Sequence, residues 1–287
     1  MVKMGRFFPY LGGKTALIPR LLKLIPAHDI YVEVFGGSAE LLFAKPRSRT
    51  EVYNDINGDL VNLFMVTRDH VDALMERLDW LLQSREIHET WKRELKAGRV
   101  PMDPIERAAR YYYILCTQFA GKMWGGWAYA KIGRRYWGDY RVKRLRGIHR
   151  RLQGVHIEHS DFRKILDTWD SPNTFFFLDP PYLDTTGYGH DFTQKDHEDL
   201  ADKLSRVEGK WLLTVGDHHL MHRLYASYLI EKAQVTLASE KVEAGRDRKG
   251  FCNLIIRNYE LNDPAQTVLG YYLLEATSEP RTREDDP

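Results

Sequence analysis

The stretch YVEVFGGSAELLF, residues 31–43, joins an extended apolar run to a glycine turn and a short apolar helix. A second extended run, EVYND at 51–55, follows it and ends in a carboxylate. A strand, a glycine turn, a helix and a second strand ending in an acid are typical of a dinucleotide-type βαβ unit. Asp55 lies 19 residues after Gly36, close to the spacing of an acid that binds ribose hydroxyls. The stretch therefore predicts an α/β, Rossmann-like fold.

Apolar periodicity extends this unit along the rest of the chain. It predicts helices over 14–24, 39–44, 60–95, 106–119 and 141–152. Strands are expected at 155–157, 174–178, 211–215 and 252–259. The run at 174–178, TFFFL, is fully apolar, as a central parallel strand should be. Thr193 and Asp196 form a capping-box pattern at the start of a further helix.

Composition excludes several classes of protein. The 287 residues are 43% hydrophobic and 29% charged, and no apolar run approaches the roughly 20 residues of a membrane helix. Two cysteines do not make a disulfide framework or a cysteine zinc cluster, and no signal-peptide core follows Met1, so we expect a cytoplasmic protein. His218, His219 and His222 lack the spacing of a zinc site, so no metal is expected.

Positive charge is concentrated in one part of the chain. Residues 91–150 hold 15 Lys and Arg against 4 Asp and Glu, whereas the whole chain has a net charge of only +2. This asymmetry favours a polyanionic partner such as nucleic acid over a merely solvated face. Trp124 and Trp127 stand in a glycine-rich stretch of this region, where a DNA-facing wedge and simple packing are equally good interpretations.

The apolar strand at 174–178 leads directly into Asp179-Pro180-Pro181-Tyr182. Each proline fixes φ and removes an N–H, so the backbone is extended and its carbonyls can accept hydrogen bonds from a ligand. Asp179 and the Pro180 carbonyl can accept the two hydrogens of an exocyclic amino group, and Tyr182 can stack on the ring that carries it. This arrangement suits transfer to an adenine N6, whose lone pair is delocalised until both N–H bonds are held.

The amino-terminal stretch PYLGGKTAL, residues 9–17, resembles half of a phosphate-binding loop. That loop requires a glycine five residues before the second glycine, and this chain has Phe8 there. Without that glycine, Lys14 has no phosphate loop to complete.

Seven segments together resemble the D12 class (α motif order) of Dam-like DNA N6-adenine methyltransferases, and they occur in family order from Phe8 to about Tyr259. They are PYLGGKTAL, EVFGGSAELLF, YNDINGDLVNLF, HSDFRKIL, FFFLDPPY, FTQKDHEDLADKL and NLIIRNYE. The resemblance implies a Rossmann-like S-adenosylmethionine-dependent methyltransferase fold with a mainly helical target-recognition insertion. It implies S-adenosyl-L-methionine as cofactor and double-stranded DNA as partner, with direct methyl transfer to a flipped-out adenine.

Motif by motif, the resemblance also implies the residues of the site. The catalytic set is Asp179, Pro180, Pro181 and Tyr182. The cofactor-binding set is Tyr10, Lys14, Phe35, Gly36, Gly37, Asp55, Asp161, Phe162 and Asp179. In this set the resemblance implies Lys14 as a cation for the carboxylate of a methionine-like ligand, with Tyr10 packed beside it. The expected catalytic domain comprises residues 1–62 and 152–275, the target-recognition domain 63–151, and 276–287 a disordered tail. One departure is Ala39, which stands where the family's glycine loop has its last glycine.

Other readings of the same motifs remain open at this point. An N6-adenine RNA methyltransferase or a protein glutamine methyltransferase would share the carboxylate-proline-proline-aromatic geometry, although a protein substrate does not call for the basic insertion. A DNA-binding protein that has lost catalysis is a rival from another class, against which the intact motif at 179–182 argues. The sequence also leaves open the target site, a restriction endonuclease counterpart and the oligomeric state.

Overall fold

The computed structural model describes residues 7–10, 12–118, 125–128, 142–183, 192–236, 250–261 and 267. The expectations for Trp124 and for a tail at 276–287 lie outside these residues. Within them, the strands are β1 (Ile30–Glu33), β2 (Thr50–Asn54), β3 (Val155–Glu158), β4 (Thr174–Leu178), β5 (Lys210–Gly216), β6 (Leu229–Thr236) and β7 (Gly250–Arg257).

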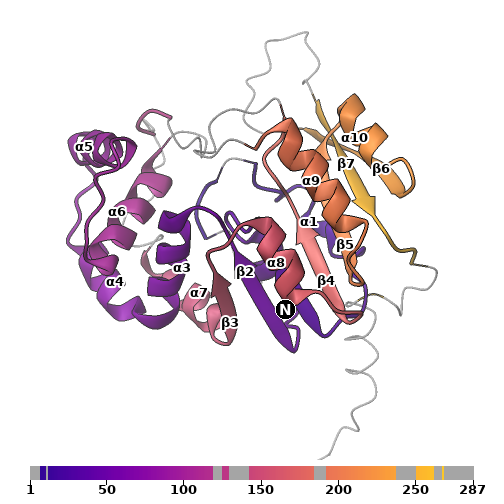
Figure 1. The fold of residues 1–287 in the computed structure, drawn as a ribbon. Helices are drawn as coiled ribbons and strands as arrows, with labels where there is room; N and C mark the ends of the chain where they lie inside the picture. Colours follow the sequence, from indigo (N-terminus) through magenta and orange to yellow (C-terminus); the bar gives the residue numbers. More distant parts are fainter. Residues whose placement is uncertain are drawn as a thin grey trace, which may run out of the picture.

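These seven strands form one sheet in the order β3-β2-β1-β4-β5-β7-β6 (Figure 1). Strands β1 to β5 pair in parallel, and β7 is antiparallel to both β5 and β6. The strand order reverses between β1 and β4, and ligands of open α/β sheets bind beyond the carboxyl ends of the strands at such a point. The fold is thus the Rossmann-like α/β fold that the sequence predicts, and it directs attention to the ends of β1 and β4.

The central strand β4 shows how the sheet divides two apolar cores. Its five residues are all buried, with Phe175 and Phe177 in one core and Phe176 and Leu178 in the other. Because strand side chains alternate between the faces of a sheet, a continuous apolar run is what a strand covered on both faces requires. One face packs against α8 (Phe162–Trp169), α9 (Gln194–Leu204) and α10 (His219–Leu224). The other carries α1 (Ile18–Leu21), α2 (Glu40–Ala44) and the helices that follow β2.

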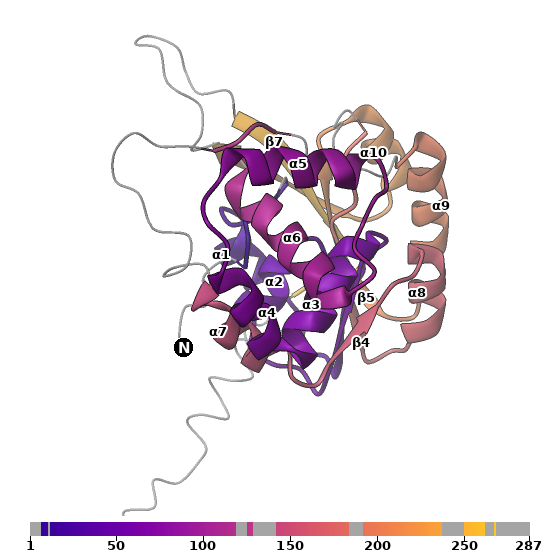
Figure 2. The same cartoon turned by 90° about the vertical axis from the view of Figure 1, so that its left-hand side faces the viewer.

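A helical insertion lies between the neighbouring strands β2 and β3. It contains α3 (Gly58–Asp69), α4 (Val71–Asp79), α5 (Arg85–Lys96), α6 (Pro104–Thr117) and α7 (Leu145–Leu152). Helices α4, α5 and α6 are grouped at one side of the molecule and face the viewer in Figure 2. Tyr111, Tyr112 and Tyr113 of α6 are buried there. The domain boundaries expected at 62/63 and 151/152 fall inside α3 and α7, which both pack into the core beside the sheet.

Several sequence expectations differ from the observed elements. The helix expected over 14–24 is mostly turns around the four-residue α1, and the helical stretch 60–95 is divided into α3, α4 and α5. Strand β6 was not expected, because its sequence LIEKAQVT carries charges and lies at the edge of the sheet, where apolar alternation is weak. Trp127, for which the sequence allowed either a DNA-facing wedge or simple packing, lies edge-on against His88, with 5.4 Å between the ring centres.

The glycine turn after β1 has one position that fits its residue poorly. A Cβ on Gly36 would lie 2.2 Å from the ring of Tyr53, so only glycine fits there. Ala39, at the end of the same turn, has φ 53° and ψ 37°, which is left-handed backbone. A residue with a Cβ is disfavoured in this conformation. The departure from the family pattern at Ala39 is therefore a strained alanine in an otherwise intact turn.

We expect Ala39→Gly to raise the free energy of unfolding. Relief of left-handed backbone is worth about 1–2 kcal/mol, and loss of one buried methyl group costs about 0.8 kcal/mol. The net gain should be up to about 1 kcal/mol, measured by urea denaturation. Ala44→Gly, in the ordinary helical backbone of α2, is the matched control and should instead lose about 1 kcal/mol. Equal losses in both variants would contradict strain at Ala39.

Candidate active site

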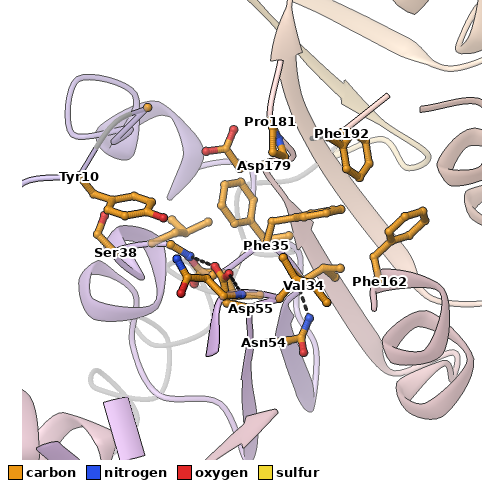
Figure 3. Close-up of a pocket in the computed structure, with 18 of the residues that line it drawn as sticks. Tyr10, Val34, Phe35, Ser38, Asn54, Asp55, Phe162, Asp179, Pro181 and Phe192 are labelled. Carbon is orange, nitrogen blue, oxygen red and sulfur yellow. Dashed lines mark hydrogen bonds between the residues drawn. The ribbon is translucent and has the colours of Figure 1, made fainter. Parts of the chain in front are cut away.

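A cavity of about 300 Å³ opens at the carboxyl ends of β1, β2 and β4 (Figure 3). This volume lies within the range of sites for small ligands. Every residue expected to bind the cofactor lines it, namely Tyr10, Lys14, Phe35, Gly36, Gly37, Asp55, Asp161, Phe162 and Asp179. Pro181 of the expected catalytic set also lines it, while Pro180 and Tyr182 adjoin it in the chain. Segments from most of the chain thus converge on one cavity.

Asn54, the last residue of β2, holds the floor of the cavity together. Its Nδ2 donates to the carbonyl of Val34 at 2.9 Å and to that of Ser160 at 3.0 Å, and its Oδ1 accepts from the Ser160 amide at 2.9 Å. The side chain is 1% exposed. Because these bonds reach the segments after β1 and β3, one buried amide fixes three strand ends relative to one another.

Asp55 presents a carboxylate with a fixed orientation. Its Oδ2 accepts from the Gly37 amide and its Oδ1 from the Asn57 amide, each at 2.8 Å. Two backbone amides therefore hold the carboxylate beside the glycine turn, and a carboxylate oxygen can accept more than one hydrogen bond. Figure 3 shows it at the centre of the cavity.

The wall opposite Tyr10 is aromatic (Figure 3). The rings of Phe35, Phe162 and Phe192 lie 5.4–5.7 Å apart, centre to centre. The Arg163 guanidinium lies over the Phe162 ring at 4.2 Å and pairs with Asp161 at 3.1 Å. This wall combines flat apolar surface with the Asp161 carboxylate, a combination suited to a heteroaromatic ring bearing an amino group.

The Asp179 carboxylate is held from two sides. Its Oδ1 accepts from Lys14 Nζ and from Thr214 Oγ1, each at 2.7 Å. Thr214 comes from β5, beside β4, whereas Lys14 comes from the amino-terminal segment. The Lys14 ammonium also lies 4.9 Å from the centre of the Tyr182 ring. The lysine that the sequence suggested for a ligand carboxylate is thus, in the structure, ion-paired with Asp179.

Gly13, directly before this lysine, lies close to the Glu40 side chain. A Cβ on Gly13 would lie 2.7 Å from Oε1 of Glu40, a cavity residue whose Oε2 accepts from the Thr15 hydroxyl at 2.8 Å. A side chain at position 13 would therefore require the Glu40 carboxylate to shift.

Sequence reasoning missed several cavity residues. Phe192 and Asp196 line the cavity, and both lie in the segment FTQKDHEDLADKL, whose capping box at Thr193 is observed. The capping box predicts where this helix begins, and it could therefore have indicated that Phe192 and Asp196 lie at the helix start. Glu33 was missed because it reads as one residue of an apolar strand; it is 2% exposed and lines the cavity.

Burial raises the pKa of the Glu33 carboxyl to about 8, against opposing hydrogen bonds from the Tyr31 hydroxyl and the Leu42 amide. The nearby charges act in opposite directions, since Lys45 lowers this pKa and Asp179 raises it. At neutral pH the protonated form of Glu33 is therefore favoured, which limits the negative charge beside Asp179.

Comparison with known proteins shows the family of this chain. A family model described as D12 class N6 adenine-specific DNA methyltransferase matches residues 10–238. The type II methyltransferase M.CviBI of Paramecium bursaria Chlorella virus NC1A is 26% identical over 261 residues, covering 86% of this chain and 97% of that protein. M1.LlaDCHI, a type II methyltransferase of Lactococcus lactis subsp. cremoris, is 24% identical and covers 90% and 96%. The DNA adenine methylase of Escherichia coli (strain K12) is 27% identical over 118 residues, 40% and 41% of the two chains.

A Rossmann-like sheet with a ligand cavity at its switch point defines a nucleotide-cofactor enzyme. The chain belongs to the D12 class of N6 adenine-specific DNA methyltransferases. It transfers a methyl group from S-adenosylmethionine to adenine N6 in DNA. The cavity fits this cofactor, because it offers a fixed carboxylate for ribose, an aromatic wall for adenine and further acidic groups for a cationic ligand.

The described residues hold neither a metal-binding group nor a membrane-spanning helix. None of their His, Cys, Asp and Glu side chains form a group able to hold a metal ion, and His222 instead pairs with Asp217 at 2.7 Å. In the same part of the chain, no helix has the length and apolar character needed to cross a bilayer.

We expect Glu33→Gln to flatten the pH dependence of stability. The folded protein holds a proton on Glu33 up to about pH 8, whereas an unfolded glutamate loses its proton near pH 4.3. The free energy of unfolding therefore falls as pH rises through this window, and the glutamine variant lacks that contribution. Urea denaturation at pH 5, 6.5 and 8 measures it. Glu198→Gln, at an exposed glutamate, should keep the wild-type slope; the same slope in all three proteins would refute buried protonation.

Proposed function

We propose that Asp179, Pro180, Pro181 and Tyr182 perform the methyl transfer. The observation that carries this proposal is the orientation of Asp179 at the end of β4, on the wall of the cavity. Within the described residues, its contacts with Lys14 and Thr214 both use Oδ1, which presents Oδ2 to a substrate. A carboxylate oriented in this way can accept a hydrogen bond without reorganising when charge develops.

S-adenosylmethionine supplies an electrophilic methyl group when it is bound. Asp179 Oδ2 and the Pro180 carbonyl accept hydrogen bonds from the two N–H groups of adenine N6. These bonds direct the nitrogen lone pair out of conjugation with the ring. Tyr182 stacks on the base, and the Asp179 carboxylate stabilises the positive charge that develops on N6 as the bond from N6 to the methyl carbon forms and the carbon–sulfur bond breaks. N6 then releases one proton to water. Because N6 is out of reach inside a duplex, the base is first turned out of the stack.

The cofactor residues divide by the part of the ligand that they suit. Asp55 binds the ribose hydroxyls from its place beside Gly36 and Gly37. Asp161 accepts from the amino group of the cofactor's adenine, and the aromatic wall of Phe35, Phe162 and Phe192 packs on that ring. Tyr10 and Lys14 close the methionine end, where Lys14 also holds Asp179. Support comes from the cavity that these side chains share.

Residues 63–151 form the target-recognition domain in this proposal, and residues 1–62 with 152–275 the catalytic domain. The basic excess at 91–150 provides the phosphate contacts that duplex DNA requires. Helix α6 of this domain also contacts the segment that follows β2. Asn57 Nδ2 donates to the Tyr111 hydroxyl at 3.1 Å, and Arg107 pairs with Asp59 at 2.7 Å. DNA held by the insertion therefore lies close to the transfer site.

We further propose a cytoplasmic role in a prokaryotic or phage-infected cell, and a restriction endonuclease counterpart that cuts the same target. Relatives named as type II methyltransferases support this pairing. Sequencing methylated adenines in DNA from cells that express the protein gives the target. An endonuclease encoded beside the gene that is blocked by this methylation would establish the pairing, and methylation of adenines without a common sequence would exclude it.

Asp179→Ala and Asp55→Ala should fail in different ways. Asp179→Ala should lower kcat on duplex DNA by about 100-fold or more, because it removes transition-state stabilisation. Asp55→Ala should chiefly weaken S-adenosylmethionine binding, by about tenfold in a calorimetric Kd. Asp202→Ala, an exposed carboxylate on α9, serves as the control that loses neither. Substantial methylation by Asp179→Ala, or an unchanged Kd in Asp55→Ala, would remove the role assigned to that residue.

Lys14→Met should lower kcat by about 10-fold to 100-fold, because Asp179 loses a charge-assisted partner. Methionine keeps most of the length of the lysine side chain and removes its charge and its hydrogen-bond donors. Lys23→Met, at an exposed lysine of the same segment, controls for the loss of one positive charge. An effect confined to the cofactor Kd would assign Lys14 to the methionine carboxylate instead of to Asp179.

A further inference from the structure

Asn253 is a buried polar residue in an apolar strand. It lies in β7 beside Leu254, Ile255 and Ile256, each of which is 0% exposed, and it is itself 6% exposed. An amide in such a position costs free energy unless it is hydrogen-bonded, so its partner indicates why it is there.

That partner is Tyr182 of the transfer site. The Tyr182 hydroxyl donates to Asn253 Oδ1 at 2.7 Å. Burial raises the pKa of the Tyr182 phenol far above its ordinary value. The phenol is therefore protonated at neutral pH, and the hydroxyl remains the donor of this bond.

The Tyr182 ring is also backed by the neighbouring strand. Asn253 of β7 pairs with Gly216 of β5, and a Cβ on Gly216 would lie 3.3 Å from Cδ2 of Tyr182. The ring thus lies against β5 at a position without a side chain, while its hydroxyl is bound to β7. Pro180 and Pro181 fix the backbone that leads to it. A tyrosine side chain has two rotatable torsions, and contacts at its flank and its tip restrain both.

We infer that Asn253 is a positioning residue for methyl transfer, which sets the plane of the Tyr182 ring on which the target adenine stacks. The inference rests on the stacking role proposed for Tyr182. A ring that is already oriented spares the entropy of ordering it when the base enters, and this lowers the barrier through orientation alone. The antiparallel strand β7 then has a part in catalysis, although none of its residues that the structure fully describes lines the cavity.

Asn253→Ala tests the inference directly. The variant should lower the single-turnover methylation rate by about tenfold, the usual weight of one buried hydrogen bond. Its Kd for S-adenosylmethionine should stay at the wild-type value. Asn253→Asp keeps an oxygen acceptor and should recover most of the rate. A duplex with 2-aminopurine at the mapped target position should show altered fluorescence with Asn253→Ala, because the flipped base is stacked differently.

A double-mutant cycle separates positioning from general destabilisation. Tyr182→Phe removes only the hydroxyl, so adding Asn253→Ala to it should cause little further loss of rate. Asn258→Ala is the matched control on the same chain segment, since the Asn258 side chain accepts from the Trp211 amide at 2.8 Å. It should lower the thermal midpoint without lowering the rate. Additive losses in the cycle would overturn positioning through the hydroxyl.

The remaining outcomes distinguish this inference from the proposed function. If Tyr182→Ala is inactive while Asn253→Ala methylates at the wild-type rate, the inference fails and the role of Tyr182 stands. If Tyr182→Ala itself methylates at the wild-type rate, the stacking role fails and the inference fails with it.

Discussion

The arrangement of the cavity depends on the ion pair between Lys14 and Asp179, which joins segments 165 residues apart. Its two side chains are only 11% and 20% exposed, so the pair is shielded from water more than surface pairs are. Among the described residues before β1, only those of the short α1 form a helix or strand. The Lys14–Asp179 pair holds this segment against the carboxyl end of β4.

Much of the fold followed from local patterns in the sequence. The apolar run TFFFL predicted β4 at its observed bounds, and the acid at Asp55 predicted where β2 leads into the cavity. Strand β6 escaped prediction because an edge strand half in water has little apolar signal. The long helical stretch at 60–95 was divided differently in the structure, since caps such as Ser84 end and restart helices without interrupting the overall periodicity.

The site was predictable to the extent that a motif carried it. Asp179, Asp55 and Asp161 belong to short patterns, and all three line one cavity. What the sequence could not predict is pairing across the sheet. Nothing near Lys14 indicates that it meets Asp179, and nothing near Asn253 indicates Tyr182, because these contacts depend on strand order and register. The raised pKa of Glu33 likewise depends on burial, which a single acidic residue in an apolar strand does not reveal by itself.

The insertion leaves the sheet after β2 and returns at β3, and these two strands are hydrogen-bonded neighbours. The excursion therefore begins and ends at almost the same place, with Arg151 of α7 buried against Glu51 at the start of β2. For a flexible connection whose ends are held together, doubling its length costs only about 0.6 kcal/mol of closure entropy. The loops between the helices of this excursion can thus be lengthened at small cost to the sheet. With the target-recognition role proposed for residues 63–151, such a chain can acquire a new DNA target while its chemistry stays the same.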